Sequence, residues 1–532
     1  MKKIATTLVF ICFISIGIAQ KNLPTDYLSK EFHQGRRDAF RDSMPPNSVA
    51  VIFAYPERVF SRDINYFFHQ NPDLYYLSGY KEPNAVLVLF KDWQGKGDTA
   101  YNEIFFVQER NEKREQWVGK RLGVEGTTKQ LGFKKVYEGN NFKNFVIDYK
   151  KFNAVIHDEL PTDIKGDGSG YDLFGLLQTF KASVVSEQGD IELHKEHLLI
   201  KKYLSPGNLK YFATDYQKQV TTNDAFKNDA VINQVLNNPD SAAIEKIKAN
   251  LKEPMWSADY YSEITNSLRE IKTPEELVLL RKSIKLSCIA HAEVMKAVSP
   301  GMSENEIEGI HRWIHRKYGA EDEGYPPIVG AGANGCILHY ESNNSTKIEN
   351  QLLLMDVGAE YHGYSADVTR TIPATGKFTT EQKAIYNLVY EAQEEIFKLC
   401  KEGTPFSSLN KKANEILAKG LIKLGIIKDE SEVNKYYPHG CSHYLGLDVH
   451  DKGNYGKLKA NMVITVEPGI YIPENSPCDK KWWNIGVRIE DDVLITKDSY
   501  EILSIDAPRK WDDIEKMAAQ KSKFKEMPLP AL

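Results

Sequence analysis

Two aspartates close together in the sequence offer the first sign of chemistry. Asp356 ends an apolar run typical of a buried strand, and Asp367 follows after the turn-like stretch 360–363. A hairpin centred between Tyr361 and His362 would place the two aspartates opposite each other, with Cβ atoms about 5 Å apart. Carboxylates that close repel each other or share a proton unless cations lie between them. Each aspartate alone would be an ordinary strand-end or turn residue, whereas the pair favours a two-metal site.

Three histidines lie within twelve positions of a glycine-punctuated segment, at His439, His443 and His450. Histidine is the commonest metal ligand, and it exchanges protons near neutral pH. A single histidine here would more often be structural. Three of the thirteen in the chain, gathered in one segment, favour a functional site.

Two glutamates also interrupt segments rich in apolar, strand-forming residues. Glu467 is followed directly by Pro468 and Gly469, which end the strand. Glu490 lies two residues after Arg488, so a plain salt bridge is the alternative to a role as metal ligand.

The region that contains these residues begins with two predicted helices. Thr273 and Glu276 form a capping box at the start of the first helix, which is predicted to end near Val298. Ser303 and Glu306 form a second box directly afterwards.

The same order of elements then repeats. Strands are predicted from 328 to 371, another capped helix begins at 379–382, and the Gly-Thr-Pro break at 403–405 separates it from a further helix. More strands are predicted up to about residue 503. The pattern predicts an internally duplicated α+β domain, and the cleft between its halves would be the expected site.

The first part of the chain has a different pattern. In residues 28–160, the strand-like runs 48–54, 85–90 and 103–107 alternate with helical or turn-rich segments, which predicts an α/β domain. Residues 160–262 are polar, with several turn signals and several Lys-rich helical stretches, so we expect irregular extensions and a linker there.

The amino terminus is typical of a secretory leader. Lys2 and Lys3 precede the apolar run 4–18, and small residues up to Ala19 suit cleavage before Gln20. A run of about 15 residues is short against the ~20 needed to span a bilayer. We therefore expect export to the periplasm or the exterior, without a stable membrane anchor.

Charge narrows the class of partner. Removal of Lys2 and Lys3 with the leader would leave 66 of the 68 basic residues against 73 acidic ones, which argues against nucleic-acid binding. The predicted organisation has four parts: a leader at 1–19, an α/β domain with its extension and linker at 20–262, the duplicated domain at 263–507 and a polar tail at 508–532.

Five segments together resemble the aminopeptidase P and prolidase branch of the pita-bread metallopeptidases. The amino-terminal runs 70–80 and 82–89 are also similar to aminopeptidase P, so the resemblance covers most of residues 35–135 and 265–505. The five segments are residues 355–358, 364–370, 439–450, 465–471 and 485–492.

The resemblance implies a dinuclear metal centre. Asp356 would bind one metal, Asp367 and Glu490 would bridge both, and His443 and Glu467 would complete the set. These ligands, mostly hard oxygens, suit Mn²⁺, while zinc, cobalt and iron stay open.

The resemblance also implies roles for other residues. Glu467 would act as a proton shuttle in addition to binding metal. His339 and His450 would hydrogen-bond the substrate and the oxyanion, His439 would line the substrate pocket, and Arg488 would orient Glu490.

The implied activity is removal of the amino-terminal residue from peptides that have proline in second position, by a homodimer or homotetramer. A prolidase, which has the same metal ligands but cleaves only dipeptides, is one alternative. A pita-bread protein that binds peptides without metal or catalysis is the other.

Overall fold

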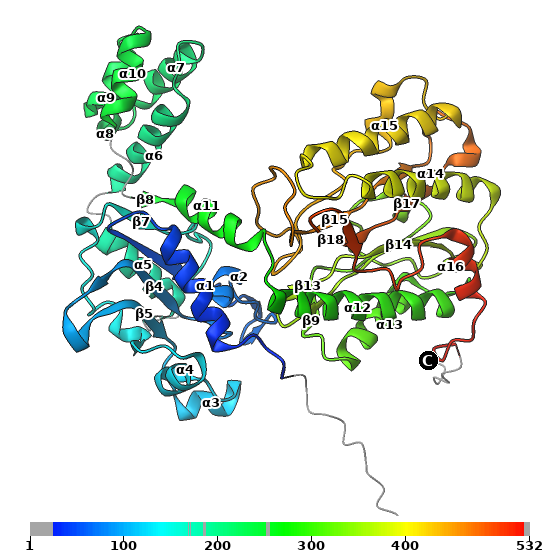
Figure 1. The fold of residues 1–532 in the computed structure, drawn as a ribbon, viewed down its shortest axis with the longest axis horizontal. Helices are drawn as coiled ribbons and strands as arrows, with labels where there is room; N and C mark the ends of the chain where they lie inside the picture. The colour runs from blue at the N-terminus through cyan, green and yellow to red at the C-terminus, as the bar shows by residue number, and fades with distance from the viewer. Residues whose placement is uncertain are drawn as a thin grey trace, which may run out of the picture.

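The computed structural model describes residues 25–525, apart from residues 167, 169, 171, 185–187 and 252–255. The predicted leader lies outside these residues. Figure 1 shows an amino-terminal α/β domain, a group of helices that projects from it, and a larger carboxyl-terminal domain.

The amino-terminal domain is built on one six-stranded sheet, with the order β6-β5-β4-β1-β7-β8. Antiparallel β1, β4 and β5 lie at its centre and coincide with the three predicted apolar runs. The strands are β1 (Ser48–Phe53), β4 (Val86–Gln94), β5 (Tyr101–Val107), β6 (Val136–Glu138), β7 (Ala154–Ile156) and β8 (Trp256–Ser257).

Short elements surround this sheet. A two-stranded hairpin, β2 (Val59–Ser61) with β3 (Ile64–Asn65), stands beside it. Its helices are α1 (Lys30–Ser43), α2 (Pro72–Ser78), α3 (Glu112–Val118), α4 (Gly123–Leu131) and α5 (Leu173–Val184).

Residues 160–262 contain the predicted helical stretches, but the expectation of irregular extensions was wrong, because most of this stretch is helical and its helices pack together. Apolar residues recur at helical spacing within a polar background, as at Phe212 and Tyr216, and their side chains pack into a separate core. Asp229 and Asp240 cap two of the helices. The projecting bundle consists of α6 (Gln188–Tyr203), α7 (Leu209–Gln219), α8 (Asp224–Asn228), α9 (Ala230–Leu236) and α10 (Ser241–Asn250).

Helix α11 (Ala258–Arg269) leads into the carboxyl-terminal domain, where three of the four long helices begin at the predicted caps and the fourth, α15, follows the predicted Gly-Thr-Pro break. Thr273 and Thr379 form capping boxes with Glu276 and Gln382, and Ser303 accepts a hydrogen bond from the backbone of Glu306. These helices are α12 (Pro274–Ala297), α13 (Glu304–Lys317), α14 (Thr380–Phe397) and α15 (Ser407–Lys423).

Short sheets lie between the helix pairs α12–α13 and α14–α15 (Figure 1). The first repeat gives β10 (Ile328–Ala331), β11 (Leu352–Asp356) and β14 (Thr369–Pro373), and also β9 (Asp322–Glu323), β12 (Ala359–Tyr361) and β13 (Tyr364–Ser365). The second gives β15 (Val463–Val466), β18 (Asp491–Ile495) and β19 (Tyr500–Ile502), and also β16 (Gly469–Ile472) and β17 (Ile485–Arg488). The structure thus has the predicted architecture, a duplicated α+β domain behind a smaller α/β domain.

The predicted hairpin register was wrong by two residues. The turn is formed by His362 and Gly363, both with positive φ (52° and 86°), so Tyr361 pairs with Tyr364. Two successive positive φ angles are the geometry of a tight hairpin turn. Asp356 consequently lies opposite Thr369 rather than opposite Asp367.

The segment predicted as a polar tail contains the amphipathic helix α16 (Trp511–Ala518). Its Ile514 is fully buried, and Trp511 and Met517 pack against the core of the carboxyl-terminal domain. Residues 526–532 lie outside the described part of the chain.

Buried ion pairs join the two domains. Arg269, at the end of α11, donates to Asp73 of α2 at 2.8 Å and also contacts Asp451. Lys272 reaches Asp451 at 2.8 Å, and Lys452 reaches Asp73 at 2.7 Å. We call these five residues the interdomain ion cluster. Within the described residues, none of the helices has the length and apolarity needed to cross a bilayer.

Candidate metal centre

All five predicted ligands face one cavity of about 290 Å³ in the carboxyl-terminal domain. They come from separate elements: Asp356 ends β11, Asp367 precedes β14, Glu467 follows β15 and Glu490 follows β17. Other residues that line the cavity are Leu338, His339, His439, Gly440, Ser442, His450 and Arg488.

The loop that contains His443 runs beside β15. The backbone of Thr465 donates to the His443 carbonyl at 2.9 Å, and the backbone of Glu467 donates to that of Cys441, also at 2.9 Å. His443 and Glu467 therefore lie on neighbouring extended segments, and their side chains project into the same cavity.

Asp356 and Asp367 meet through a tyrosine. The Tyr325 hydroxyl oxygen lies 2.5 Å from Asp356 Oδ1 and 2.6 Å from Asp367 Oδ1. A hydroxyl has one proton, so it can donate to only one of the two carboxylates at a time. Burial and the charge of Asp356 raise the pKa of Asp367. The tyrosine is neutral, so it joins the two acids without adding positive charge between them.

His443 is held in the tautomer that a metal ligand requires. Its Nδ1 lies 3.0 Å from the Tyr444 carbonyl, which only accepts, so Nδ1 must be the donor. Nε2 points instead toward Asp367 Oδ2 at 3.3 Å and Glu467 Oε1 at 3.4 Å. Although burial opposes a charged ring, these carboxylates raise the pKa of His443 to about 9.

The two glutamates are also protonated more readily than usual. Burial, together with the charges of Asp367 and Asp356, raises the pKa of Glu467 to about 7. Burial and the charges of Asp367 and Glu467 raise the pKa of Glu490 well above its ordinary value. The protein by itself does not neutralise this group of acids.

Arg488 contacts Asp356 directly, whereas it was expected to orient Glu490. Its guanidinium donates to Asp356 Oδ2 at 2.6 Å and to the Thr369 hydroxyl at 3.2 Å. Thr369 in turn donates to Glu490 Oε2 at 2.6 Å. Arg488 therefore reaches Glu490 only through Thr369.

The other predicted histidines lie at the wall of the cavity. His439 uses Nδ1 to donate to the Gly440 carbonyl and Nε2 to accept from the Tyr471 hydroxyl, at 2.6 and 2.9 Å. His339 and His450 are exposed. The His450 ring lies edge-on to His443 at 4.4 Å between centroids. Because His339 and His450 are exposed at the cavity, an incoming ligand can reach both.

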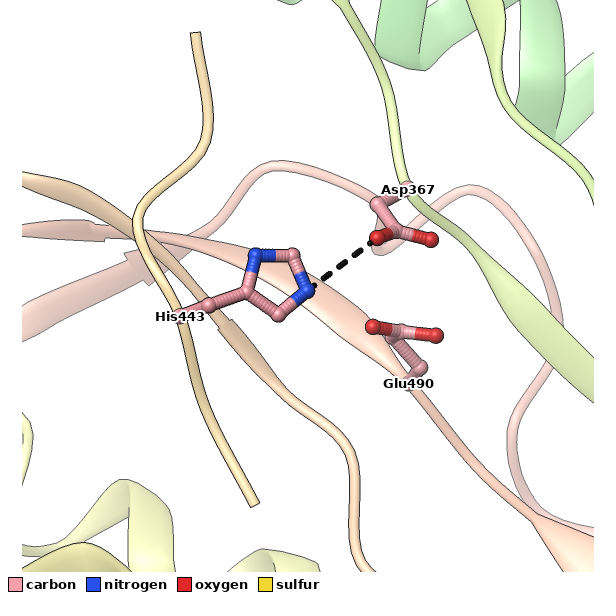
Figure 2. A group of neighbouring side chains, drawn as sticks. All are labelled: Asp367, His443 and Glu490. Atoms are coloured by element: carbon pink, nitrogen blue, oxygen red, sulfur yellow. Dashed lines mark ion pairs between the residues drawn. The ribbon is translucent and has the colours of Figure 1, made fainter. Parts of the chain in front are cut away.

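The donor set fits divalent cations. One ligand atom each from Asp367, His443 and Glu490 lies within 4.8 Å of the others, and Figure 2 shows the two carboxylates and the ring pointing toward one another. Asp356 and Glu467 add two more carboxylates at the same cavity. Cations would relieve the repulsion that raises the pKa values of Asp367, Glu467 and Glu490.

Sequence reasoning missed two residues of this site. Tyr325 lies in a Gly-Tyr-Pro-Pro stretch that has no local sign of chemistry. Thr369 falls within one of the family-like segments, but only the register of β14 shows that it connects Arg488 with Glu490.

Comparison with known proteins identifies the family. Residues 278–497 match the metallopeptidase family M24, and residues 33–156 match the aminopeptidase P amino-terminal domain. The Xaa-Pro aminopeptidase of Escherichia coli is 33% identical over 505 residues, which cover 92% of this chain and 97% of that protein. The chain belongs to metallopeptidase family M24. Within it, the resemblance to aminopeptidase P extends over both domains, and the chain is a metalloaminopeptidase.

Other relatives agree with this assignment. Human Xaa-Pro aminopeptidase 3 is 30% identical over 486 residues, which cover 90% of this chain and 82% of that protein. The structure of E. coli aminopeptidase P with the inhibitor Pro-Leu superposes with a TM-score of 0.70 at 30% identity, over 92% of this chain and 98% of that one. Proline aminopeptidase P II from Yersinia pestis superposes with a TM-score of 0.71 at 29% identity, over 92% and 100%.

Proposed function

We propose that this protein is a Xaa-Pro aminopeptidase that uses two divalent cations to hydrolyse the bond before a proline in second position. One observation carries the proposal: four carboxylates and an imidazole line a single cavity in a chain 33% identical to a Xaa-Pro aminopeptidase, and three of those acids, Asp367, Glu467 and Glu490, have raised pKa values. Buried acids with perturbed pKa values in a cavity are typical of active sites.

Asp356, Asp367, His443, Glu467 and Glu490 would hold the cations, with Asp367 and Glu490 between them. When bound, such cations polarise the substrate carbonyl and make water more acidic. Four carboxylates favour Mn²⁺. A zinc-substituted form of the E. coli enzyme exists in complex with product, so both metals belong in the test.

Glu467 would transfer the proton to the leaving nitrogen. That nitrogen belongs to proline, and the broken bond is a tertiary amide, so the departing amine must be protonated. Glu467 faces the same cavity as the other proposed ligands, so its carboxylate would lie within reach of both the water and the departing nitrogen.

His339 and His450 would hydrogen-bond the peptide and the developing oxyanion, because both are exposed at the cavity. His439 would shape the pocket rather than donate to the substrate, because both its ring nitrogens already have partners within the protein. Arg488 would fix the orientation of the Asp356 carboxylate.

Hydrolysis of matched substrates tests the activity. The metal-free protein is loaded with Mn²⁺ or Zn²⁺ and given a Xaa-Pro dipeptide, a Xaa-Pro-Xaa tripeptide and a Xaa-Ala-Xaa tripeptide. We expect release of the first residue from the proline tripeptide. Cleavage of the dipeptide alone would identify a prolidase, and activity on none of them would contradict the proposal.

Elemental analysis separates an enzyme from a peptide-binding relative without metal. After incubation with Mn²⁺ and removal of free metal, we expect two ions per chain. A protein that retains none would fit the binding alternative instead.

We also propose a homodimer or homotetramer. Large apolar side chains are unusually exposed around the β2–β3 hairpin, beside a cavity of about 960 Å³. Val59, Phe60 and Phe67 are 62%, 64% and 69% exposed. Exposed apolar patches of this kind mark interaction surfaces. A monomeric mass by light scattering would contradict this assembly.

We also propose that the protein is exported after removal of its leader. Mass spectrometry of the mature protein tests this, and we expect its amino terminus at Gln20.

A further inference from the structure

The strand pair that contains the two aspartates is irregular where Asp367 lies. Regular pairing reaches Asp356 opposite Thr369 on one side and resumes with Glu360 opposite Ser365 on the other. Between these points, the Val357 backbone donates to the Val368 carbonyl at 3.2 Å, and Ala366 donates to Ala359 at 2.9 Å. The residues on both sides of Asp367 are thus outside the regular ladder.

Helix α12 supplies two side chains at this irregular stretch. Ser287 Oγ accepts from the Ala359 backbone at 2.9 Å, and His291 Nε2 lies 2.8 Å from the Val368 carbonyl oxygen. Residues four apart lie on the same face of a helix. The helix therefore contacts both strands, one with each side chain.

The chemistry of His291 is fixed by its surroundings. A carbonyl only accepts, so Nε2 must carry the proton and donate it. The ring is fully buried, and burial lowers its pKa to about 3, which keeps it neutral with this single N–H. Nδ1 has no hydrogen-bond partner among the described residues. Burying an unpaired nitrogen is unfavourable, so the bond from Nε2 to the Val368 carbonyl offsets part of the cost of placing a histidine here.

The bond matters because Val368 is the immediate neighbour of Asp367 in the chain. The Val368 carbonyl accepts from both Val357 and His291, so it is held from two directions. On the other side, the backbone N–H of Asp367 is held by Asp492 at 3.2 Å. Backbone bonds thus surround Asp367 and direct its carboxylate toward Tyr325 and His443.

We propose that His291 is a positioning residue for the metal centre: its Nε2–H fixes the Val368 carbonyl and thereby aims the Asp367 carboxylate at the cations. This inference rests on the proposed two-metal function. It adds a requirement for a hydrogen-bond donor on α12, on the side of the strands away from the cavity.

Two variants of matched length isolate the donor. His291→Gln retains an N–H near the position of Nε2, whereas His291→Met has a similar shape and none. Titration of metal-free protein with Mn²⁺ by calorimetry should show about 10- to 100-fold weaker binding in His291→Met, the range for groups that orient metal ligands. His291→Gln should stay within about threefold of the wild type.

Ser287→Ala is the control, because it removes a bond of the same kind from the same helix, but to a residue three positions from Asp356. It should lower the melting temperature without changing the affinity for Mn²⁺. Equal affinities in the Gln and Met variants, an equal loss in Ser287→Ala, or a Met variant that does not fold would each overturn the inference. A wild-type protein that binds no Mn²⁺ or Zn²⁺ would overturn the metal centre itself.

Discussion

The interdomain ion cluster and the metal centre both bury charged residues, but only the first has enough basic residues to pair with all its carboxylates. Asp73 and Asp451 face Arg269, Lys272 and Lys452. Although burial opposes ionisation, Arg269 and Lys452 lower the pKa of Asp73 to about 2. In the metal centre, four acids face Arg488 and His443, and the pKa values of Asp367, Glu467 and Glu490 are raised.

The difference separates structural charges from functional ones. A buried carboxylate with paired cations is stable as an ion, because the partners replace the hydration it loses. A buried carboxylate without them becomes protonated or recruits a cation from solution. The sign of the pKa shift, rather than burial alone, indicates which acids bind metal.

The largest expected effect is on the metal-centre side of this comparison. Glu467→Ala removes both a ligand and the proposed proton donor, so kcat should fall by roughly 10³-fold or more with the fold retained. Steady-state assays at saturating Mn²⁺ and circular dichroism measure the two quantities. Glu474→Ala, at an exposed position shortly after β16, is the control and should be silent. Full turnover in metal-loaded Glu467→Ala would reject the role of Glu467.

On the other side, Asp73→Ala should destabilise the protein. It removes one of the two carboxylates that pair with the buried Arg269 and the nearest partner of the half-buried Lys452, and breaking a buried pair in this way costs about 3–5 kcal/mol. Urea denaturation measures the change. Glu415→Ala breaks exposed pairs with Lys412 and Lys419 and should leave the free energy of unfolding almost unchanged. Equal losses in the two variants would remove the distinction.

Arg488 forms a buried ion pair with Asp356 inside the metal centre, like the pairs of the interdomain ion cluster. Arg488→Lys retains the charge but not the simultaneous contacts to Asp356, Thr369 and Tyr471. We expect the affinity for Mn²⁺ to fall by about 10- to 100-fold. Arg281→Lys, at an exposed pair with Glu501, should leave the affinity unchanged. An unaltered affinity in Arg488→Lys would show that charge alone suffices.

The smallest effect concerns pH, and the two clusters should respond in opposite directions. The pKa values of Glu467 and His443 are raised to about 7 and 9 in the folded protein, so the stability they give below their unfolded pKa values is lost as pH rises through 7 and 9. The pKa of Asp73 is lowered to about 2, so its contribution is lost only as pH falls below about 4.

Melting curves test this opposition. Without metal, the melting temperature should fall by about 5 °C between pH 6 and pH 9. With Mn²⁺ the fall should disappear, because metal binding needs deprotonated ligands and strengthens as pH rises. A metal-free protein whose melting temperature is flat over this range would contradict the assignment of raised pKa values.

The sequence predicted the elements of the fold well, because their signals are local. The capping boxes at Thr273 and Thr379 mark helix starts, and the apolar runs mark β1, β4 and β5. Lys-rich helical stretches were predicted in 160–262, but their packing into a bundle was not, because their apolar residues are few against a polar background.

The site was predicted less completely, because part of it depends on register and on distant pairing. The five candidate ligands stood out as polar residues in apolar segments. The hairpin turn was assigned one residue too early, which moved the partner of Asp356 by two positions. The interdomain ion cluster was not foreseen, because Asp73 and Asp451 lie far apart in the chain, and Tyr325 was not foreseen because a lone tyrosine carries no pattern.

The bundle α6–α10 has a core of its own, separate from the cores of the two domains, so its stability depends mainly on contacts within itself. Such a part forms its own cooperative unit of unfolding. Its amide protons can therefore exchange with solvent through openings that leave the catalytic cavity intact.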